Sequence, residues 1–287
     1  MSPQPEAPLD DSIAFTRIHE RIAAEMLKAF APQSPTAGFC EGLVDVEGAL
    51  RKRPASLVID VGAYDGADAV KFASAGHKVI SIEATPAKKH AILKRISRSS
   101  HADRITFLLA AASKQSGNVT FTTFGKGSMQ DQIRPHGWTA NSHEVQVPAV
   151  TLDSVVGPTA HVLYAKIDAQ GHDGAVVLGA RGLIATQRLQ FISLEVSPRL
   201  ATNTSEYVEA LALLLAHGYA CMDCSHGWTP HPTVYSVRQA DWAPRKSSRT
   251  VEARLAELAR NAPCDRIASG CWTNVACGLA ESRSSFT

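Results

Sequence analysis

Short apolar runs alternate with amphipathic segments along the middle of the chain. Each run has the length and composition of a strand buried on both faces of a parallel sheet. Helical periodicity fills the gaps, for example at 67–75, which ends at Gly76, and at 203–217, which ends at Gly218. The alternation predicts an α/β fold with right-handed crossovers between parallel strands. The expected parallel strands are 57–61, 78–83, 104–110, 161–168 and 189–196.

The pattern changes to a period of two between residues 111 and 162. The segments 118–124 and 143–150 alternate around a polar loop, which predicts an inserted β-hairpin at about 114–150. Further strands are expected at 219–224 and 271–277, and a second insertion at about 225–263 lies between them.

Residues 1–55 are expected to form an N-terminal tail and helical extension, and 56–287 one domain. The tail is rich in proline, and apolar residues between Phe15 and Phe30 then recur every three or four positions. In the helix expected at 203–217, Asn203 and Glu206 have the spacing of a capping box.

Charge and hydropathy exclude several classes of partner. The chain has 287 residues, 29 basic and 27 acidic, with a net charge of +2, so electrostatics give no case for nucleic acid. No segment has the ~20 apolar residues needed to cross a bilayer, and the start resembles no signal peptide. We therefore expect a soluble, cytoplasmic protein without nucleic-acid or membrane partners. Its oligomeric state is open.

Six cysteines are too sparse for a disulfide scaffold in a chain of this length. Cys221 and Cys224 have the spacing of half a zinc site or of a redox pair, but the later cysteines contain no second pair with this spacing. Reduced, buried thiols are therefore expected.

The segment LVIDVGAYDG, at 57–66, joins a buried strand to a helix through an acidic turn. Gly62 and Gly66 allow a tight bend and close approach of a ligand, and Glu83 lies 21 residues after Gly62, where a carboxylate can bind ribose hydroxyls. A dinucleotide site needs a third glycine, and Asp60 and Asp65 would repel a pyrophosphate. The turn instead favours the sulfonium and zwitterionic tail of S-adenosylmethionine.

A second group of polar residues follows later strands. Asp168 and Glu195 stand at the ends of two strands, where ligands collect in an open parallel sheet. His172 lies one turn after Asp168 and can accept a proton from a substrate hydroxyl, with Asp168 or Asp173 orienting it. The alternatives are a histidine that caps the next helix, or a magnesium or manganese site of Asp168, His172 and Glu195. No metal is expected.

Five segments in this order resemble the FkbM-type S-adenosylmethionine-dependent methyltransferases. They are IDVGAYDG, SIEATP, VPAVTLDSVV, YAKIDAQGHDGAVVLGARGLI and FISLEV. The resemblance implies a class I methyltransferase, Rossmann-like fold: a seven-stranded sheet with an antiparallel last strand and helices on both faces. It also implies methyl transfer from S-adenosylmethionine to a hydroxyl oxygen of a small-molecule or sugar substrate.

The resemblance assigns a role to individual residues. Asp168 and His172 would face the transferred methyl as catalytic residues. Tyr64, Ala84-Thr85 and Ala169-Gln170 depart from the family pattern, and Gln170 leaves the substrate-side role of its loop in question. The cofactor-binding residues implied are Asp60, Gly62, Tyr64 and Gly66 at the methionine end, Glu83 with Ala84 at the ribose, Ala111 and Ala112 at the adenine, and Asp168.

Two other functions compete with methyl transfer. An NAD-dependent oxidoreductase would use a related sheet, although the glycine spacing counts against it. A non-catalytic cofactor-binding scaffold would also retain the pocket, but converging carboxylates that must be desolvated argue against an empty relic.

Overall fold

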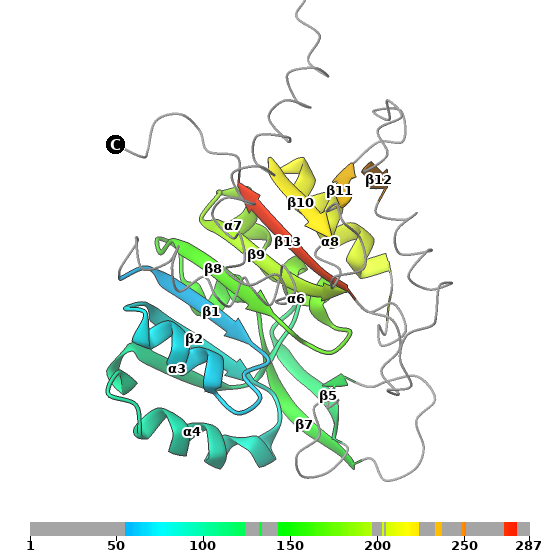
Figure 1. Ribbon diagram of the computed structural model, residues 1–287. Helices are drawn as coiled ribbons and strands as arrows, with labels where there is room; N and C mark the ends of the chain where they lie inside the picture. Colours follow the sequence, from blue (N-terminus) through cyan, green and yellow to red (C-terminus); the bar gives the residue numbers. More distant parts are fainter. Residues whose placement is uncertain are drawn as a thin grey trace, which may run out of the picture.

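The main sheet of the computed structural model has nine strands (Figure 1). The structure describes residues 55–123, 132–133, 143–196, 203, 205–223, 233–236, 248–250 and 273–279. In spatial order the strands are β12 (Ser248–Thr250), β11 (Thr233–Ser236), β10 (Tyr219–Asp223), β13 (Thr273–Leu279), β9 (Leu189–Val196), β8 (Val162–Ile167), β1 (Leu57–Val61), β2 (Lys78–Glu83) and β3 (Ile105–Leu109).

The strands from β9 to β3 are parallel to their neighbours, as the alternating pattern predicts. The last strand, β13, lies between β9 and β10 and runs antiparallel to both. The expected count of seven strands is wrong for this sheet, because β11 and β12 add two strands beyond β10. Both lie within the segment expected to be an insertion, at 225–263.

Helices cover the two faces of the sheet. On one face, Phe72 of α3 (Ala67–Ser74) contacts Tyr164 of β8 edge to face, with ring centroids 5.8 Å apart. On the other, Ala165 and Ile167 of β8 belong to a core that includes residues of later helices, as the period of two requires. The other helices among the described residues are α4 (Lys89–Ser97), α5 (Leu152–Val156), α6 (Asp173–Leu178), α7 (Arg181–Ala185) and α8 (Ser205–Ala216), with 3-10 turns η2 (Pro86–Lys88) and η3 (Ala102–Arg104).

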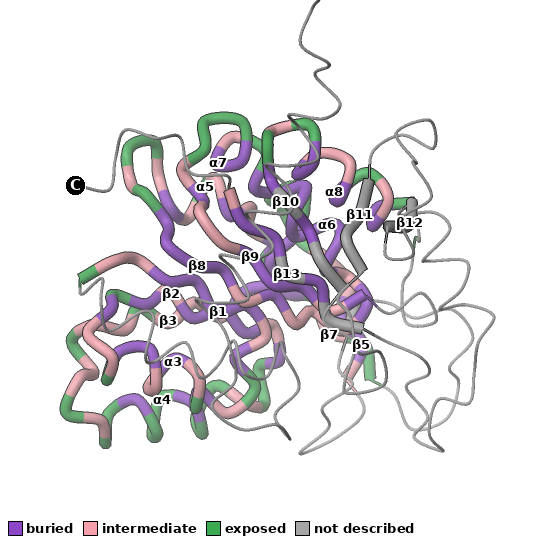
Figure 2. The backbone as a smooth tube through the Cα atoms, turned by 45° about the horizontal axis from the view of Figure 1, so that its top comes forward, coloured by how far each residue is buried: buried purple, intermediate pink, exposed green. Residues whose placement is uncertain are grey.

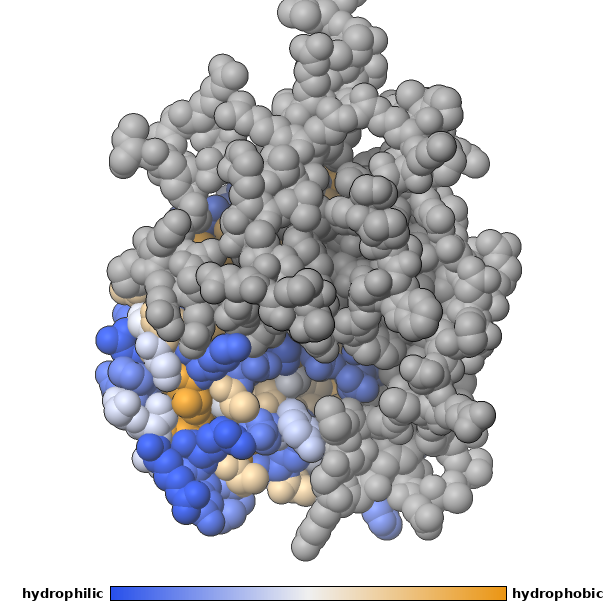
Figure 3. Space-filling model, viewed as in Figure 1, coloured by the Kyte–Doolittle hydropathy of each residue, from blue (hydrophilic) through white to orange (hydrophobic). Residues whose placement is uncertain are grey.

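The central strands are largely buried, whereas most residues of α4 are exposed. Figure 2 shows buried residues along β1, β8 and β9 and exposed residues along α4. Ile92 and Ile96 of α4 face the core, whereas Lys89, Lys94 and Arg95 are exposed. The part of the surface over α3 and α4 is largely hydrophilic (Figure 3). The exposed basic residues of α4 therefore form a solvated face.

A second sheet contains the strands expected from the alternating segments. β5 (Gly117–Thr123) and β7 (His143–Val150) pair antiparallel, and β4 (Ala111–Ala112) and β6 (Gln132–Ile133) complete the order β4-β7-β5-β6. In Figure 1 the carboxyl ends of β1 and β2 point toward β5 and β7. This sheet therefore stands beside the edge where ligands are expected.

Asp153, in the segment VPAVTLDSVV, holds two helices together. Its carboxylate oxygens accept hydrogen bonds of 2.8 Å from the backbone N–H groups of Gly182 and Leu183, at the start of α7. These N–H groups lack partners within their own helix, so a carboxylate from α5 satisfies them. The role of this residue is to fix the fold.

The end of α8 agrees with the sequence, but its start does not. Gly218 follows the helix with a φ of +86°, as expected for a helix-ending glycine. The expected capping box is absent: Asn203 Oδ1 accepts from the N–H of Ser205, and the Glu206 carboxylate binds Lys114 Nζ at 2.7 Å. A partner 92 residues away has displaced the local interaction.

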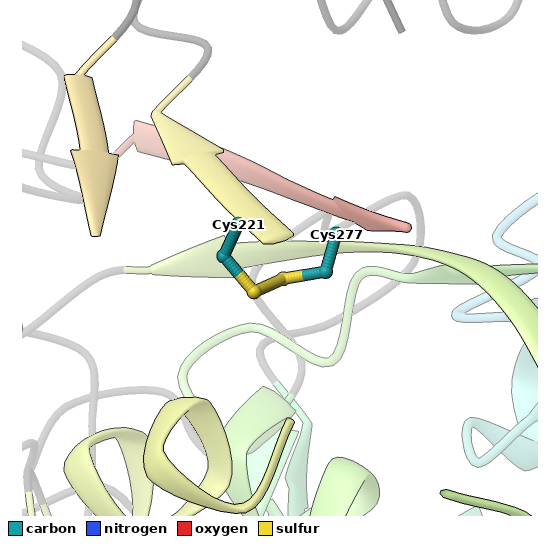
Figure 4. The surroundings of a disulfide bond; sticks show 2 residues. All are labelled: Cys221 and Cys277. Atoms are coloured by element: carbon teal, nitrogen blue, oxygen red, sulfur yellow. A yellow bond between two sulfur atoms is a disulfide. The ribbon is translucent and has the colours of Figure 1, made fainter. Parts of the chain in front are cut away.

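A disulfide joins Cys221 of β10 to Cys277 of β13 (Figure 4). The expectation of reduced thiols is therefore wrong for these two residues. The register of β10 and β13 places them directly opposite each other, with Cα atoms 4.1 Å apart, which is close enough for a disulfide. Cys224, the other half of the short-spaced pair, lies outside the described residues.

Several expectations concern residues outside the described ranges. These include the N-terminal extension at 1–54, most of the loop between β5 and β7, and the helix expected within the second insertion. Within the described part of the chain, no helix is both long enough and apolar enough to span a membrane.

Candidate functional site

A cavity of about 250 Å³ lies at the carboxyl ends of β1, β2 and β8. It is the place where an open parallel sheet collects ligands. Its lining combines the glycine turn, the acidic end of β2, residues beyond β3 and the loop after β8. The lining residues are Val61 to Asp65, Ala67, Asp68, Ile82 to Ala84, Lys88, 110–112, Phe121, Lys166, 168–170 and His172.

Gly62 brings the turn after β1 against the loop after β8. Its φ is +78°, and its N–H donates to the Ile82 carbonyl at 2.9 Å. A Cβ at this position would lie 1.9 Å from the carbonyl oxygen of Asp168. The absent side chain is therefore what lets the turn and Asp168 approach each other.

Gly66 lies outside the residues that line the cavity, although it was assigned to the cofactor. It precedes α3 with φ +78°, and a Cβ on it would lie 3.2 Å from a methyl group of Ile92. Ile92 belongs to α4, so the absence of a side chain at Gly66 allows the turn to pack closely against this helix.

Glu83 is held at the end of β2 by two backbone groups. Its Oε2 accepts from the N–H of Tyr64 and its Oε1 from the N–H of Thr85, each at 2.8 Å. Each carboxylate oxygen retains a second lone pair for a ligand hydroxyl. The bond to Tyr64 accompanies an unusual backbone conformation, because Tyr64 has a φ of +52°. The ring of Tyr64 is exposed, and Lys88 Nζ lies over it, 4.9 Å from the ring centroid.

Asp60 was expected to bind the cofactor, but it lies beneath the cavity and does not line it. It is fully buried, and its Oδ2 accepts from Ser81 Oγ at 3.4 Å. Lys166 Nζ lies 3.6 Å from Asp60 Oδ1 and 3.0 Å from Asp68 Oδ2. Burial raises the pKa of Asp60 to about 6, although Lys166 opposes this shift.

The loop after β8 is fixed by hydrogen bonds to two carboxylates. Gln170 Nε2 donates to Asp168 Oδ1 at 2.7 Å, so the residue that departs from the family pattern orients this carboxylate. The fully buried Asp173 accepts 3.2 Å bonds from the N–H groups of Ala169, Gly171 and Glu195. Burial, and then the neighbouring Asp168, raises the pKa of Asp173 to about 8.

His172 lies at the start of α6 and lines the cavity. His172 is the N-cap residue of α6, as the capping alternative expects, but its side chain makes no capping hydrogen bond to the helix. Nε2 lies 3.0 Å from Ser113 Oγ, and buried Nδ1 has no hydrogen-bond partner among the described residues. Burial lowers the pKa of the imidazole below its ordinary value of 6.5. The ring is therefore neutral near pH 7, and Ser113 takes the place expected for Asp168 or Asp173 as its partner.

Glu195 stands at the end of β9 but does not line the cavity. Burial raises its pKa well above 4.5, and Asp168 and Asp173 add to this effect. Within the described residues, no group of three or more His, Cys, Asp or Glu side chains is placed to hold a metal ion.

The lining changes from polar to apolar along the sheet. Lys166 and Asp168 lie at β8, Gly62 at β1 and Glu83 at β2, and the two alanines of β4 follow β3 along the chain. Three strand spacings separate β8 from β3, about 14 Å. Phe121 of β5 adds an aromatic ring to the lining. The cavity therefore suits an elongated ligand with a charged end and an aromatic end.

Most of the residues expected from the sequence meet in this cavity. Reasoning from the sequence missed Lys166, Asp68, Lys88 and Phe121. A lysine within the otherwise buried strand β8 was a usable signal, because an unpaired charge is costly there. The expected residues in the lining are Gly62, Tyr64, Glu83, Ala84, Ala111, Ala112, Asp168 and His172.

Comparison with solved structures finds distant likenesses. The methyltransferase FkbM from Methylobacillus flagellatus KT has 16% identity and a TM-score of 0.42, over 76% of this chain and 56% of its own. The present chain thus spans just over half of that protein. A putative rRNA-methylase from Clostridium thermocellum has 8% identity and a TM-score of 0.43, over 84% and 97% of the two chains.

A third structure is TrmK from M. capricolum in complex with S-adenosyl-homocysteine. It has 7% identity and a TM-score of 0.38, over 84% of this chain and 70% of its own. No curated protein matches the sequence.

The sequence itself matches a family model. The model describes the methyltransferase FkbM domain, and the match covers residues 60–221, more than half of the chain. The matched region runs from the end of β1 to β10, and it includes the glycine turn, Glu83, Asp168 and His172. This protein therefore belongs to the FkbM methyltransferase family.

Proposed function

We propose that this protein transfers a methyl group from S-adenosylmethionine to a hydroxyl oxygen of a small-molecule or sugar substrate. The observation that carries the proposal is one cavity that joins Glu83, the glycine turn, Asp168 and His172. S-adenosylmethionine supplies a methyl group activated by a sulfonium. The protein's tasks are to align this group with the acceptor and to remove a proton.

The residues present fit this cofactor. Gly62 and Asp168, which approach each other because Gly62 has no side chain, both line the cavity. Glu83 would hold the ribose hydroxyls, and Ala84, Ala111, Ala112 and Phe121 would contact the adenine. Tyr64 would cover the ribose from the rim, and Asp168 would face the methionine end, where its negative charge favours a sulfonium.

His172 would act as the general base. Because Nδ1 is buried, the basic atom would be Nε2, and the proton of a substrate hydroxyl would reach it through the Ser113 hydroxyl, which donates to Nε2 in the tautomer with the proton on Nδ1. A neutral imidazole accepts a proton from a hydroxyl as the oxygen attacks the methyl group. Its lowered pKa keeps it in the basic form down to below pH 6.5.

Two measurements test the proposal in sequence. Mass spectrometry of the purified protein is expected to find S-adenosylmethionine or S-adenosylhomocysteine, and a screen with labelled methyl groups then identifies a hydroxylated acceptor. Titration with NADH tests the oxidoreductase alternative, which requires that the protein bind NADH. Cofactor binding without transfer to any acceptor would favour a non-catalytic scaffold, and the absence of adenosyl-ligand binding would reject the proposal.

Substitution of His172 tests the base. His172→Gln is expected to lower turnover by about 10²- to 10⁴-fold, the usual contribution of a general base, with S-adenosylhomocysteine affinity within about threefold of wild type. His90→Gln is the control, because His90 is exposed on α4 and should change neither quantity. Equal turnover in the two variants rejects the role of His172.

A further inference from the structure

Lys166 is a cation in the lining of the cavity to which neither the sequence nor the proposed reaction assigns a role. It lies on β8, and 19% of its side chain is exposed. Its side chain shares a sheet face with Asp60, because the register of β1 and β8 pairs the two residues. The ammonium thus lies beside a buried carboxylate, and Lys166 also lines the cavity.

Two aspartates compensate the charge of Lys166, Asp68 on α3 and Asp60 on β1. Nζ lies 3.0 Å from Asp68 Oδ2 in the first turn of this helix and 3.6 Å from Asp60 Oδ1. Burial alone lowers the pKa of Lys166, but the neighbouring aspartates outweigh burial and raise it above its ordinary value. The residue is therefore a permanent cation at neutral pH.

An ammonium group donates three hydrogen bonds, and the two aspartates account for at most two. Because Lys166 also lines the cavity, the remaining N–H is available to a ligand. An anionic acceptor at this depth gains a charge-assisted bond that is stronger than one in water. Asp68 and Asp168 also line the cavity, so its lining offers one cation and two carboxylates near β8 and the start of α3.

We infer that Lys166 binds the carboxylate of the amino-acid part of S-adenosylmethionine, while Asp68 and Asp168 bind its ammonium group. This inference rests on the proposed function and extends it, because the acidic residues alone account only for the cationic groups. The cofactor is a zwitterion at this end, and the lining of the cavity supplies groups of both charges. Lys166 thereby fixes which way the methionine chain points, and with it the direction of the methyl group.

The test compares three ligands by calorimetry: S-adenosylhomocysteine, its decarboxylated analogue, and 5′-methylthioadenosine, which lacks the amino-acid part. Wild-type protein is expected to bind S-adenosylhomocysteine at least tenfold more tightly than the decarboxylated analogue. In Lys166→Gln this difference should fall to less than twofold, while the affinity for 5′-methylthioadenosine stays within threefold. A purely structural role in holding α3 would weaken all three ligands together.

Two further variants keep the test decisive. Lys88→Gln removes the other lining cation, which lies beside Tyr64, and it should keep the preference for the carboxylate. If Lys166→Gln fails to fold because Asp60 loses its partner, the Lys166→Gln/Asp60→Asn double variant removes both charges.

The outcomes separate the two proposals. If wild type binds all three ligands without preferring the carboxylate, or if Lys166→Gln keeps the preference, the role of Lys166 is rejected and the proposed function stands. If none of the three ligands binds to wild type, the proposed function fails and the inference fails with it.

Discussion

Replacing Gly62 with alanine tests the contact on which the cavity depends. The new Cβ would lie 1.9 Å from the Asp168 carbonyl oxygen, so the two segments must separate by about 1.5 Å to reach an ordinary contact. A side chain at φ +78° also costs about 1–2 kcal/mol of backbone strain. Overpacking against the backbone adds about 1–3 kcal/mol. We expect Gly62→Ala to lower the free energy of unfolding by about 2–5 kcal/mol.

A matched control separates strain from the clash. Gly218 has a φ of +86°, but the nearest atom to a Cβ there, Gln187 Nε2, is 3.8 Å away. Gly218→Ala should therefore show the strain alone, and the difference between the variants in urea unfolding measures the clash. Displacement of Asp168 should also weaken S-adenosylhomocysteine binding at least tenfold in Gly62→Ala and leave it unchanged in Gly218→Ala. Equal unfolding midpoints and equal affinities would refute the reasoning.

Three further predictions concern stability. Reducing the Cys221–Cys277 disulfide, which closes a loop of 56 residues, should cost about 4 kcal/mol by loop entropy, and equal urea midpoints with and without reductant would contradict this. Burial lowers the pKa of His77, so its neutral form stabilises the fold above pH 6.5, and this stability is lost as the pH falls. Wild type should lose more stability than His77→Leu between about pH 7.5 and about pH 5, and parallel losses would disprove it. Gly174→Ala places a Cβ 2.7 Å from the Glu206 backbone, where α6 meets α8, and should cost about 1–3 kcal/mol in thermal or urea unfolding.

The parallel strands were predictable because they are short, continuous apolar runs bounded by turns. β1, β2 and β9 have the predicted bounds, and β3 and β8 are each one residue shorter at both ends. The edge strands β11 and β12 were missed, because they are short and fall in a segment without clear periodicity. Local pattern thus defined the centre of the sheet and left its margin undetermined.

The site was predictable where the chemistry is local to one turn. Residue type and spacing indicate both the turn after β1 and the end of β2. Glu83 lines the cavity as expected. Asp60 does not line the cavity, and the sequence does not show that Lys166, over 100 residues later, lies beside it. The Cys221–Cys277 disulfide and the Lys114–Glu206 pair depend in the same way on long-range register.

A crystal structure of the protein with S-adenosylhomocysteine tests the central claim most directly. The account predicts the ribose hydroxyls on Glu83, the adenine beside Ala111, Ala112 and Phe121, and the amino-acid end between Asp168 and Lys166. A nucleoside bound away from the carboxyl ends of β1, β2 and β8, or a cavity without ligand at saturating concentration, would contradict it.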